Sequence, residues 1–229
     1  LGFDGRCLSA SFMEELEAAL RNTKIQIIYE KDLVGEIWED RPALSRKPAW
    51  FLEDENCGAS FTEKLVIVRE EMKKKGAESL LLTSLDDIAW LFNMRGDDIA
   101  FNPVVLSFCI ITEQEVRLFI QKGSLNEEQE MALTMAGVVL DDYLNVYDYV
   151  KTLHVESIWV NDQKTSYALM ENIPNGVRLI KGMTPVAYTK CVKNEKEQEN
   201  IRAAHLKDGV AMTKFMYWLK QNAGKVEMT

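Results

Sequence analysis

The spacing of apolar residues predicts two kinds of element along the chain. Between residues 78 and 180, short apolar runs alternate with stretches in which apolar residues recur every three or four positions. Strand candidates are residues 80–82, 104–111, 116–120, 138–140, 158–160 and 177–180. The run 104–111 is apolar except for Ser107, which is typical of a strand covered on both faces. The pattern predicts an α/β domain, with helices flanking a mixed β-sheet.

Local signals predict where several helices begin and end. Ser60 and Glu63 have the spacing of a capping box ahead of an apolar-periodic run, and Gly76 stands where a helix-ending glycine is expected. Asn194 and Glu197 repeat this spacing ahead of a long helix. Further helices are expected at residues 84–92, 125–136, 145–153 and 164–171.

The remaining segments predict the domain organisation. Residues 11–21 form an amphipathic pattern, 24–29 a short strand pattern and 32–38 a turn or short helix. Because one strand and one helix cannot bury two faces, residues 1–46 are expected to be the C-terminal part of a first domain. Residues 47–59 have the composition of a linker, and residues 60–186 form the middle domain. Residues 187–229 begin a truncated third domain, since the apolar stripe of the long helix needs a partner.

Charge and composition exclude several classes of protein. The net charge of −9 argues against a nucleic-acid partner, which requires a basic surface. No apolar run approaches the length that crosses a bilayer, so no membrane partner is expected. Cys7, Cys57, Cys109 and Cys191 are far apart, so the sequence predicts neither a zinc site nor a disulfide framework. Reduced thiols and the acidic balance favour a cytoplasmic protein.

Three pairs of aspartates are candidates for chemistry, since paired carboxylates bind divalent metals or share acid and base roles. Residues 86–87 are interpreted as favourable charges at a helix start, and residues 141–142 as a solvated turn after a strand. Residues 97–98 lie in a polar loop between a helix and a buried strand, a common place for ligand sites in α/β proteins. The alternative for this loop is a plain turn in which Arg95 pairs with an aspartate.

The other chemical side chains favour structural roles. His154 is expected to interact with a helix end or to lie in the core, and His205 to pair with Asp208 on the long helix. No serine has a visible histidine partner, and no nucleophile elbow or phosphate-binding loop is present. Large aromatic residues are expected in the core or in domain contacts: Trp90, Phe92, Phe101, Phe108, Tyr217 and Trp218. The residues alone therefore predict no assembled active site.

Three motifs carry a resemblance to a known family. Residues 83–99, with the continuation 102–105, closely resemble the middle domain of the three-domain Xaa-Pro aminopeptidases of the creatinase superfamily. Residues 2–6, 33–34 and 37–42 resemble the end of that family's first domain. Residues 192–195 and 204–211 resemble the helix that opens its catalytic domain. The resemblance implies a creatinase N-terminal-like domain with partial flanking segments.

The resemblance also implies an activity for a longer protein. The family removes the N-terminal residue from peptides with proline at the second position. Its pita-bread catalytic domain holds two divalent metals, usually manganese, through two aspartates, one histidine and two glutamates, and the metals activate a shared water. The resemblance places these ligands beyond the opening helix. No catalytic residue, no metal ligand and no cofactor are therefore expected in this chain, whose partners are the missing catalytic domain and a second copy in a homodimer.

The resemblance assigns the loop of residues 93–97 to the wall of the substrate cleft. Asn93, Arg95, Gly96 and Asp97 match the family's loop positions. Arg95 is expected to attract a substrate carboxylate or peptide carbonyl, and Gly96 to allow a backbone conformation closed to other residues. The alternative interpretation is a stand-alone α/β binding or dimerisation module without peptidase activity.

Overall fold

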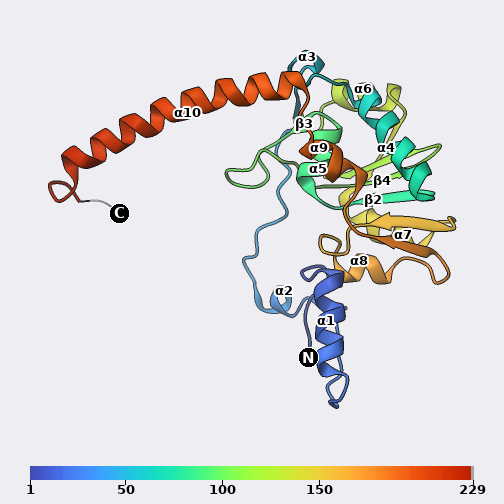
Figure 1. Ribbon diagram of the computed structural model, residues 1–229. Coiled ribbons are helices and arrows are strands. Elements are labelled where there is room, and N and C mark those ends of the chain that lie inside the picture. Colours follow the sequence, from blue (N-terminus) through green and yellow to red (C-terminus); the bar gives the residue numbers. More distant parts are fainter. Residues whose placement is uncertain (228–229) are drawn as a thin grey trace.

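The centre of the molecule is a six-stranded mixed sheet with the order β6-β5-β4-β2-β7-β8 (Figure 1). The computed structural model describes residues 1–227. The strands are β2 (Ser79–Leu82), β4 (Ser107–Thr112), β5 (Val116–Ile120), β6 (Val138–Asp142), β7 (Ser157–Val160) and β8 (Arg178–Lys181). Strand β4 is antiparallel to β2 and β5, whereas β2 and β7, β7 and β8, and β5 and β6 run parallel. The predicted α/β fold with a mixed sheet is therefore confirmed.

Helices cover both faces of the sheet because successive side chains of a strand point to opposite sides. Leu80 and Leu82 pack into a core with α4, α5, α6 and α9, whereas Leu81 packs with α7 and α8. All three leucines are at most 1% exposed. These helices are α4 (Phe61–Lys75), α5 (Leu85–Leu91), α6 (Glu127–Met135), α7 (Val146–Lys151), α8 (Tyr167–Glu171) and α9 (Pro185–Cys191), and a 3₁₀ turn, η1 (Tyr143–Asn145), precedes α7.

The predicted helix boundaries at α4 are confirmed. The Ser60 side chain accepts a hydrogen bond from the backbone N–H of Glu63, and the Glu63 carboxylate accepts one from the backbone N–H of Ser60 at 2.8 Å. Helix α4 ends at Gly76, whose φ of 67° lies in the left-handed region that favours glycine. Helix α9 was not predicted, although Thr184 caps it and Pro185 stands at its first turn.

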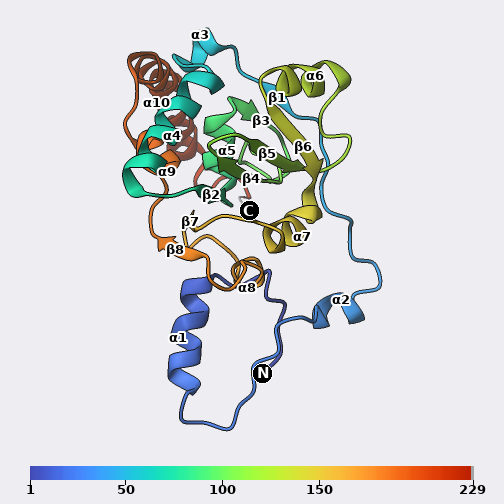
Figure 2. The ribbon, with the colours of Figure 1, turned by 90° about the vertical axis from the view of Figure 1, so that its right-hand side faces the viewer.

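The first 46 residues contact the sheet domain at α8, at the loop before it and, through Ser45, at Asp98. Helix α1 (Ala10–Leu20) lies beside α8 and then extends away from the sheet domain (Figure 2), and α2 (Leu33–Ile37) follows it. The rings of Tyr29 and Tyr167 meet edge to face at 4.8 Å. The strand expected at residues 24–29 is wrong: Ile28 forms only an isolated bridge with Gly2. A strand needs a neighbouring strand to complete its ladder, and the described residues provide none here.

The segment 47–59 contains short elements of its own. Strand β1 (Trp50–Phe51) pairs antiparallel with β3 (Met94–Arg95), and α3 (Asp54–Cys57) ends at Gly58 with a φ of 72°. The backbone N–H of Ala49 also donates to the Ser124 carbonyl at 2.7 Å. These contacts hold the segment against the sheet domain.

Helix α10 (Glu195–Asn222) leaves the sheet domain and projects away from it (Figure 1). Its 28 residues span about 42 Å at 1.5 Å per residue. The predicted capping box of Asn194 and Glu197 is confirmed at its start. Tyr217 and Trp218 are exposed, so of their two expected places, the core or a domain contact, the core is excluded in the described structure. Across residues 1–227, no helix combines the length and apolar character that crossing a membrane requires.

Candidate functional site

The loop of residues 92–106 joins α5 to β4 at the edge of the sheet where β2 ends. Leu82, the last residue of β2, pairs with Cys109 just after this loop enters β4. Parallel strands β2 and β7 both end at this edge, which is the common ligand-binding edge of α/β sheets. The loop extends from the sheet domain on the side from which α10 leaves (Figure 1). Its position is therefore suited to contact a molecule or domain on that side.

Asn93 is buried and holds the loop from within. It is 4% exposed and has a φ of 53°, a left-handed conformation in which asparagine is among the favoured residues. Its side-chain nitrogen donates to Asp54 Oδ1 at 2.9 Å and to the Ala59 carbonyl at 3.0 Å. Its side-chain oxygen accepts a hydrogen bond from Lys64 Nζ. The amide is thus engaged by neighbouring segments on both of its atoms.

Arg95 lies at the end of β3 with its side chain partly buried. Its Nη1 donates to the carbonyls of Ala89 at 2.8 Å and Met94 at 2.9 Å. Burial lowers the pKa of the guanidinium from its ordinary value. The alternative in which Arg95 pairs with an aspartate is wrong, since no ion pair within residues 1–227 includes Arg95. Backbone carbonyls orient the guanidinium, and no carboxylate of residues 1–227 lies within ion-pair distance of it.

Gly96 is required for a close approach between two segments. A Cβ atom at this position would lie 2.5 Å from Val105 Cγ2 and 3.3 Å from the Val104 carbonyl oxygen. The φ of Gly96 is not among the positive values in the chain, so the expected special backbone conformation is wrong. The absence of a side chain lets residues 96 and 104–105 pack together.

Asp98 organises the loop, whereas Asp97 lies exposed beside it. Asp98 Oδ1 accepts hydrogen bonds from the Ser45 hydroxyl at 2.6 Å and the Lys47 backbone N–H at 3.1 Å. Asp98 Oδ2 accepts one from the Leu106 backbone N–H at 2.8 Å. At Asp97 the backbone carbonyl accepts a hydrogen bond from Lys47 Nζ at 2.9 Å. The sequence indicates both aspartates as a pair. It does not indicate that Asp98 is the one whose carboxylate accepts three hydrogen bonds.

Phe101 stands at the exposed part of the same loop. It has a φ of 63° and its side chain is fully exposed. Of its two expected places, the core or a domain contact, the core is excluded among the described residues. An aromatic residue in this position is available to contact a further domain or a ligand.

The other two aspartate pairs have structural partners. Asp86 and Asp87 lie in the first turn of α5, as predicted, and both carboxylates contact Lys190 of α9. Burial raises the pKa of the Asp87 carboxyl.

Asp141 accepts a hydrogen bond from Arg117 at 3.2 Å, and residues 141–142 end β6. Their interpretation as a turn after the strand is wrong, because pairing with β5 continues through both residues.

The two histidines lie apart from the loop. His205 is exposed on α10, and no ion pair to Asp208 is found within residues 1–227. His154 follows α7 and lines a hollow of about 1060 Å³ together with Arg69, Lys73 and Arg178. This hollow lies beside the amino ends of β2 and β7, at the opposite edge of the sheet.

Among the described residues, no three His, Cys, Asp or Glu side chains gather in a way that could hold a metal ion. These residues therefore do not fit the two-metal site that the resemblance assigns to a catalytic domain.

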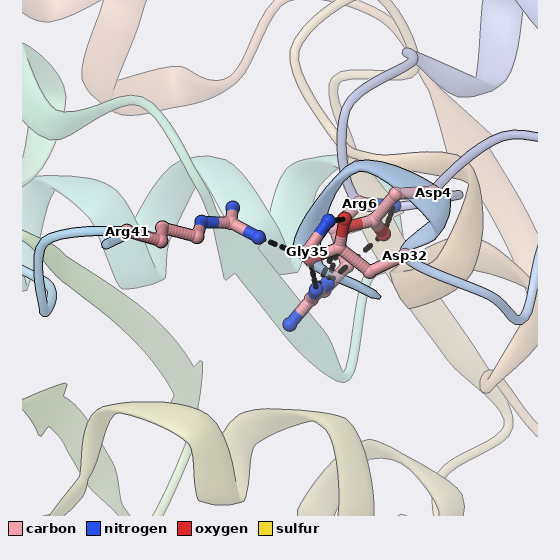
Figure 3. A network of polar contacts seen from close by, with 5 residues as sticks. All are labelled: Asp4, Arg6, Asp32, Gly35 and Arg41. Atoms are coloured by element: carbon pink, nitrogen blue, oxygen red, sulfur yellow. Dashed lines mark hydrogen bonds and ion pairs between the residues drawn. The ribbon is translucent and has the colours of Figure 1, made fainter. Parts of the chain in front are cut away.

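A network of charged side chains holds the N-terminal segment together (Figure 3). Arg6 donates to both oxygens of Asp4, at 2.9 and 2.7 Å, and to Asp32 at 3.2 Å. Arg41 contacts the same Asp32 carboxylate, which also accepts the Gly35 backbone N–H at 2.8 Å. The hydrogen bond from Arg6 lowers the pKa of Asp4, and the one from Gly35 lowers the pKa of Asp32. Residues from the two ends of this segment thus meet at one carboxylate.

Comparisons with known proteins identify the family and support the fold. The family model described as the creatinase/prolidase N-terminal domain matches residues 40–197, and the chain belongs to this family. The chain is similar to Xaa-Pro aminopeptidase 1 of Dictyostelium discoideum, with 32% identity over 232 residues that cover 96% of this chain and 36% of that protein. It is also 32% identical to human Xaa-Pro aminopeptidase 2, covering 98% of this chain and 35% of that protein. The chain therefore spans about a third of the length of these relatives.

A solved structure is similar along nearly the whole chain. It is the X-prolyl aminopeptidase from Caenorhabditis elegans, described as a cytosolic enzyme with a di-nuclear active site. The TM-score is 0.88 at 26% identity, and the match covers 96% of this chain and 37% of that one. The resemblance to Xaa-Pro aminopeptidases that the motifs indicate is thereby confirmed.

Proposed function

We propose that this chain is the non-catalytic region of an Xaa-Pro aminopeptidase, which removes the N-terminal residue that precedes proline in a peptide. Residues 1–46 are the end of its first creatinase-N-like domain, residues 47–59 the linker, residues 60–186 the middle domain, and residues 187–229 the opening of the pita-bread catalytic domain. The similarity to the C. elegans enzyme supports this proposal most strongly, because it extends over 96% of the chain and so includes segments outside the sheet domain.

In this proposal the loop of residues 93–97 walls the substrate cleft. The guanidinium of Arg95 is held in place by two carbonyls and has no carboxylate partner within residues 1–227, which suits it to bind a substrate carbonyl or carboxylate. Asp97 is exposed at the rim, and Gly96 brings the loop close to residues 104–105. Asn93 fixes the start of the loop from inside the domain.

Hydrolysis belongs to the catalytic domain that α10 opens. Two divalent metals, manganese by family resemblance, would supply an activated water there. The di-nuclear active site described for the C. elegans enzyme supports two metals in the complete protein, and its description as cytosolic supports a cytoplasmic location. The region described here contributes to the substrate cleft and to the assembly of a homodimer.

The test uses the complete protein that carries this chain. With manganese present, it should release the first residue of a peptide that has proline in second position. Arg95→Gln should raise KM or lower kcat for that peptide, since it removes the positive charge at the cleft. Arg178→Gln is the matched control, because Arg178 is an exposed arginine at the opposite edge of the sheet. Unchanged kinetics in Arg95→Gln would exclude the role of Arg95.

Measurements on the same complete protein distinguish a peptidase from the alternative, a dimerisation module without peptidase activity. Absence of turnover by the complete wild-type protein with manganese would exclude the peptidase assignment. A stable dimer of the chain in light scattering, together with that absence, would favour a dimerisation module.

A further inference from the structure

The candidate loop and helix α10 are connected through one buried lysine and one tryptophan. Lys64 of α4 is 2% exposed, and its Nζ donates to the Trp90 carbonyl at 2.8 Å and to the Asn93 side chain. The ammonium group also lies 4.4 Å from the centroid of the Trp90 ring, within range of a cation–π interaction. A buried charge is costly unless such partners surround it, so these contacts fix Lys64, Trp90 and Asn93 together.

Trp90 extends the same network to α10. Its indole N–H donates to Glu197 Oε1 at 2.9 Å. The other oxygen of Glu197 accepts the backbone N–H of Asn194 at 2.9 Å, which closes the capping box of α10. One tryptophan thus contacts the lysine through its carbonyl and ring, and the first turn of α10 through its nitrogen.

A second set of contacts places α10 against α3 and Gly58, which follow strand β1 in the chain. Asn194 donates from its side chain to the Cys57 carbonyl at 2.8 Å, and Asn200 donates to the Asn56 carbonyl at 2.7 Å. The backbone of Gly58 lies so close that a Cβ there would be 2.6 Å from Asn194 Oδ1. The rest of α10 is largely exposed, so its direction relative to the sheet domain depends on these contacts at its first turns.

We infer that Trp90 is a positioning residue that holds α10, and the domain it leads into, at a fixed angle to the candidate loop. Asn93 begins the loop, Arg95 follows two residues later, and Trp90 is joined to both the loop and α10. This inference rests on the proposed function for its catalytic consequence: Trp90 would set the distance between Arg95 and the scissile bond without touching the substrate. The structural part, the fixed angle of α10, can be tested separately.

The structural test measures a distance by electron spin resonance in the 229-residue chain. Spin labels are attached at Met131→Cys on α6 and Leu206→Cys on α10, both exposed positions, with the exposed Cys7 and Cys191 replaced by serine. The labelled chain with Trp90 and Glu197 unchanged should give one narrow distribution of distances between the two spin labels. Trp90→Phe, which keeps an aromatic ring but removes the N–H donor, should lose the narrow peak, and so should Glu197→Ala.

Two variants keep this test specific. Glu197→Gln keeps one of the two acceptor oxygens, which can still accept the Trp90 N–H, so its distance distribution should stay narrower than that of Glu197→Ala. Glu195→Ala removes an exposed acid from the same first turn and should keep the narrow peak. A narrow peak in Trp90→Phe overturns the inference. If Trp90→Phe does not fold, the contrast between Glu197→Ala and Glu197→Gln decides, and equal distributions overturn it.

The catalytic test compares Trp90→Phe with wild type in the complete protein. Misplacement of Arg95 should raise KM for a peptide with proline in second position, and Glu195→Ala should preserve wild-type kinetics. A broadened distance with unchanged kinetics would overturn the catalytic role of Trp90. Inactivity of the wild type would instead reject the proposed function, while the distance measurement would still decide whether Trp90 orients α10.

Discussion

Asp98 accepts a hydrogen bond of 2.6 Å from the Ser45 hydroxyl and thereby joins two segments that are 53 residues apart in the chain. The same carboxylate accepts the backbone N–H groups of Lys47 and Leu106. It therefore closes the candidate loop onto the segment that leads into β1. Two of the three donors come from residues 45–47 and the third, Leu106, from the loop itself, so this carboxylate joins the loop to that segment.

Removal of this carboxylate should loosen the loop. Asp98→Ala leaves the three donors without their acceptor, and hydrogen bonds to charged groups contribute about 1.5–3 kcal/mol each. Because water replaces part of the loss at this partly exposed site, we expect the free energy of unfolding to fall by about 1–3 kcal/mol in urea titrations. The Leu106 amide should also exchange its hydrogen faster.

Asp97→Ala is the matched control for this change. The Asp97 side chain is exposed, and only its backbone carbonyl is engaged. Its replacement should change stability by less than about 0.5 kcal/mol. Equal losses in the two variants would contradict the role assigned to Asp98.

Gly96→Ala should strain the contact between the loop and the start of β4. The new Cβ would lie 2.5 Å from Val105 Cγ2, so the methyl group or the backbone must shift, at a cost of about 1–3 kcal/mol. Val105→Ala should reduce this cost, giving a favourable coupling in a double-mutant cycle. Gly209→Ala, where no atom lies within 4 Å, is the control and should cause no loss. Additive effects of Gly96→Ala and Val105→Ala would argue against a direct clash.

The N-terminal network predicts a dependence on acid pH. Arg6 lowers the pKa of Asp4 below its ordinary value of 3.8, so the folded state binds that proton less tightly than the unfolded chain. The contact therefore stabilises the fold above about pH 3.8 and is lost as the pH falls through the lowered pKa. Asp4→Asn should lose less stability than wild type between about pH 6 and about pH 2. Melting curves at the two pH values that fall in parallel for both proteins would exclude this linkage.

Features set by neighbouring residues could be predicted from the sequence. The Ser60–Glu63 capping box and the glycine end of α4 depend on a few adjacent positions, and both are present. The strands β2 and β4 were predicted because burial on both faces leaves a continuous apolar run. Helix α9 also has a local start signal, since Thr184 caps it and Pro185 follows in its first turn.

Features set by distant partners could not be predicted. The strand pattern of residues 24–29 lacks the neighbour that would pair with it in the described structure. The need for glycine at position 96 arises from Val105, nine positions away, and the importance of Asp98 arises from Ser45. Likewise, nothing near Trp90 in the sequence indicates that Glu197 accepts its indole hydrogen. The candidate loop could be found from its motif, but the roles of its residues required the fold.

The proposal that hydrolysis occurs in a separate catalytic domain predicts how this chain responds to manganese. Hydrolysis by paired cations requires several carboxylate and imidazole ligands around one water, and residues 1–227 bring no three such ligands together. The 229-residue chain with manganese chloride should therefore release no amino acid from a peptide with proline in second position. Its Tm should also match that in magnesium chloride, because an ion raises Tm only when it binds the folded state preferentially. A Tm raised by manganese alone, together with turnover, would place a working metal site inside this chain and contradict the assignment of chemistry to a separate domain.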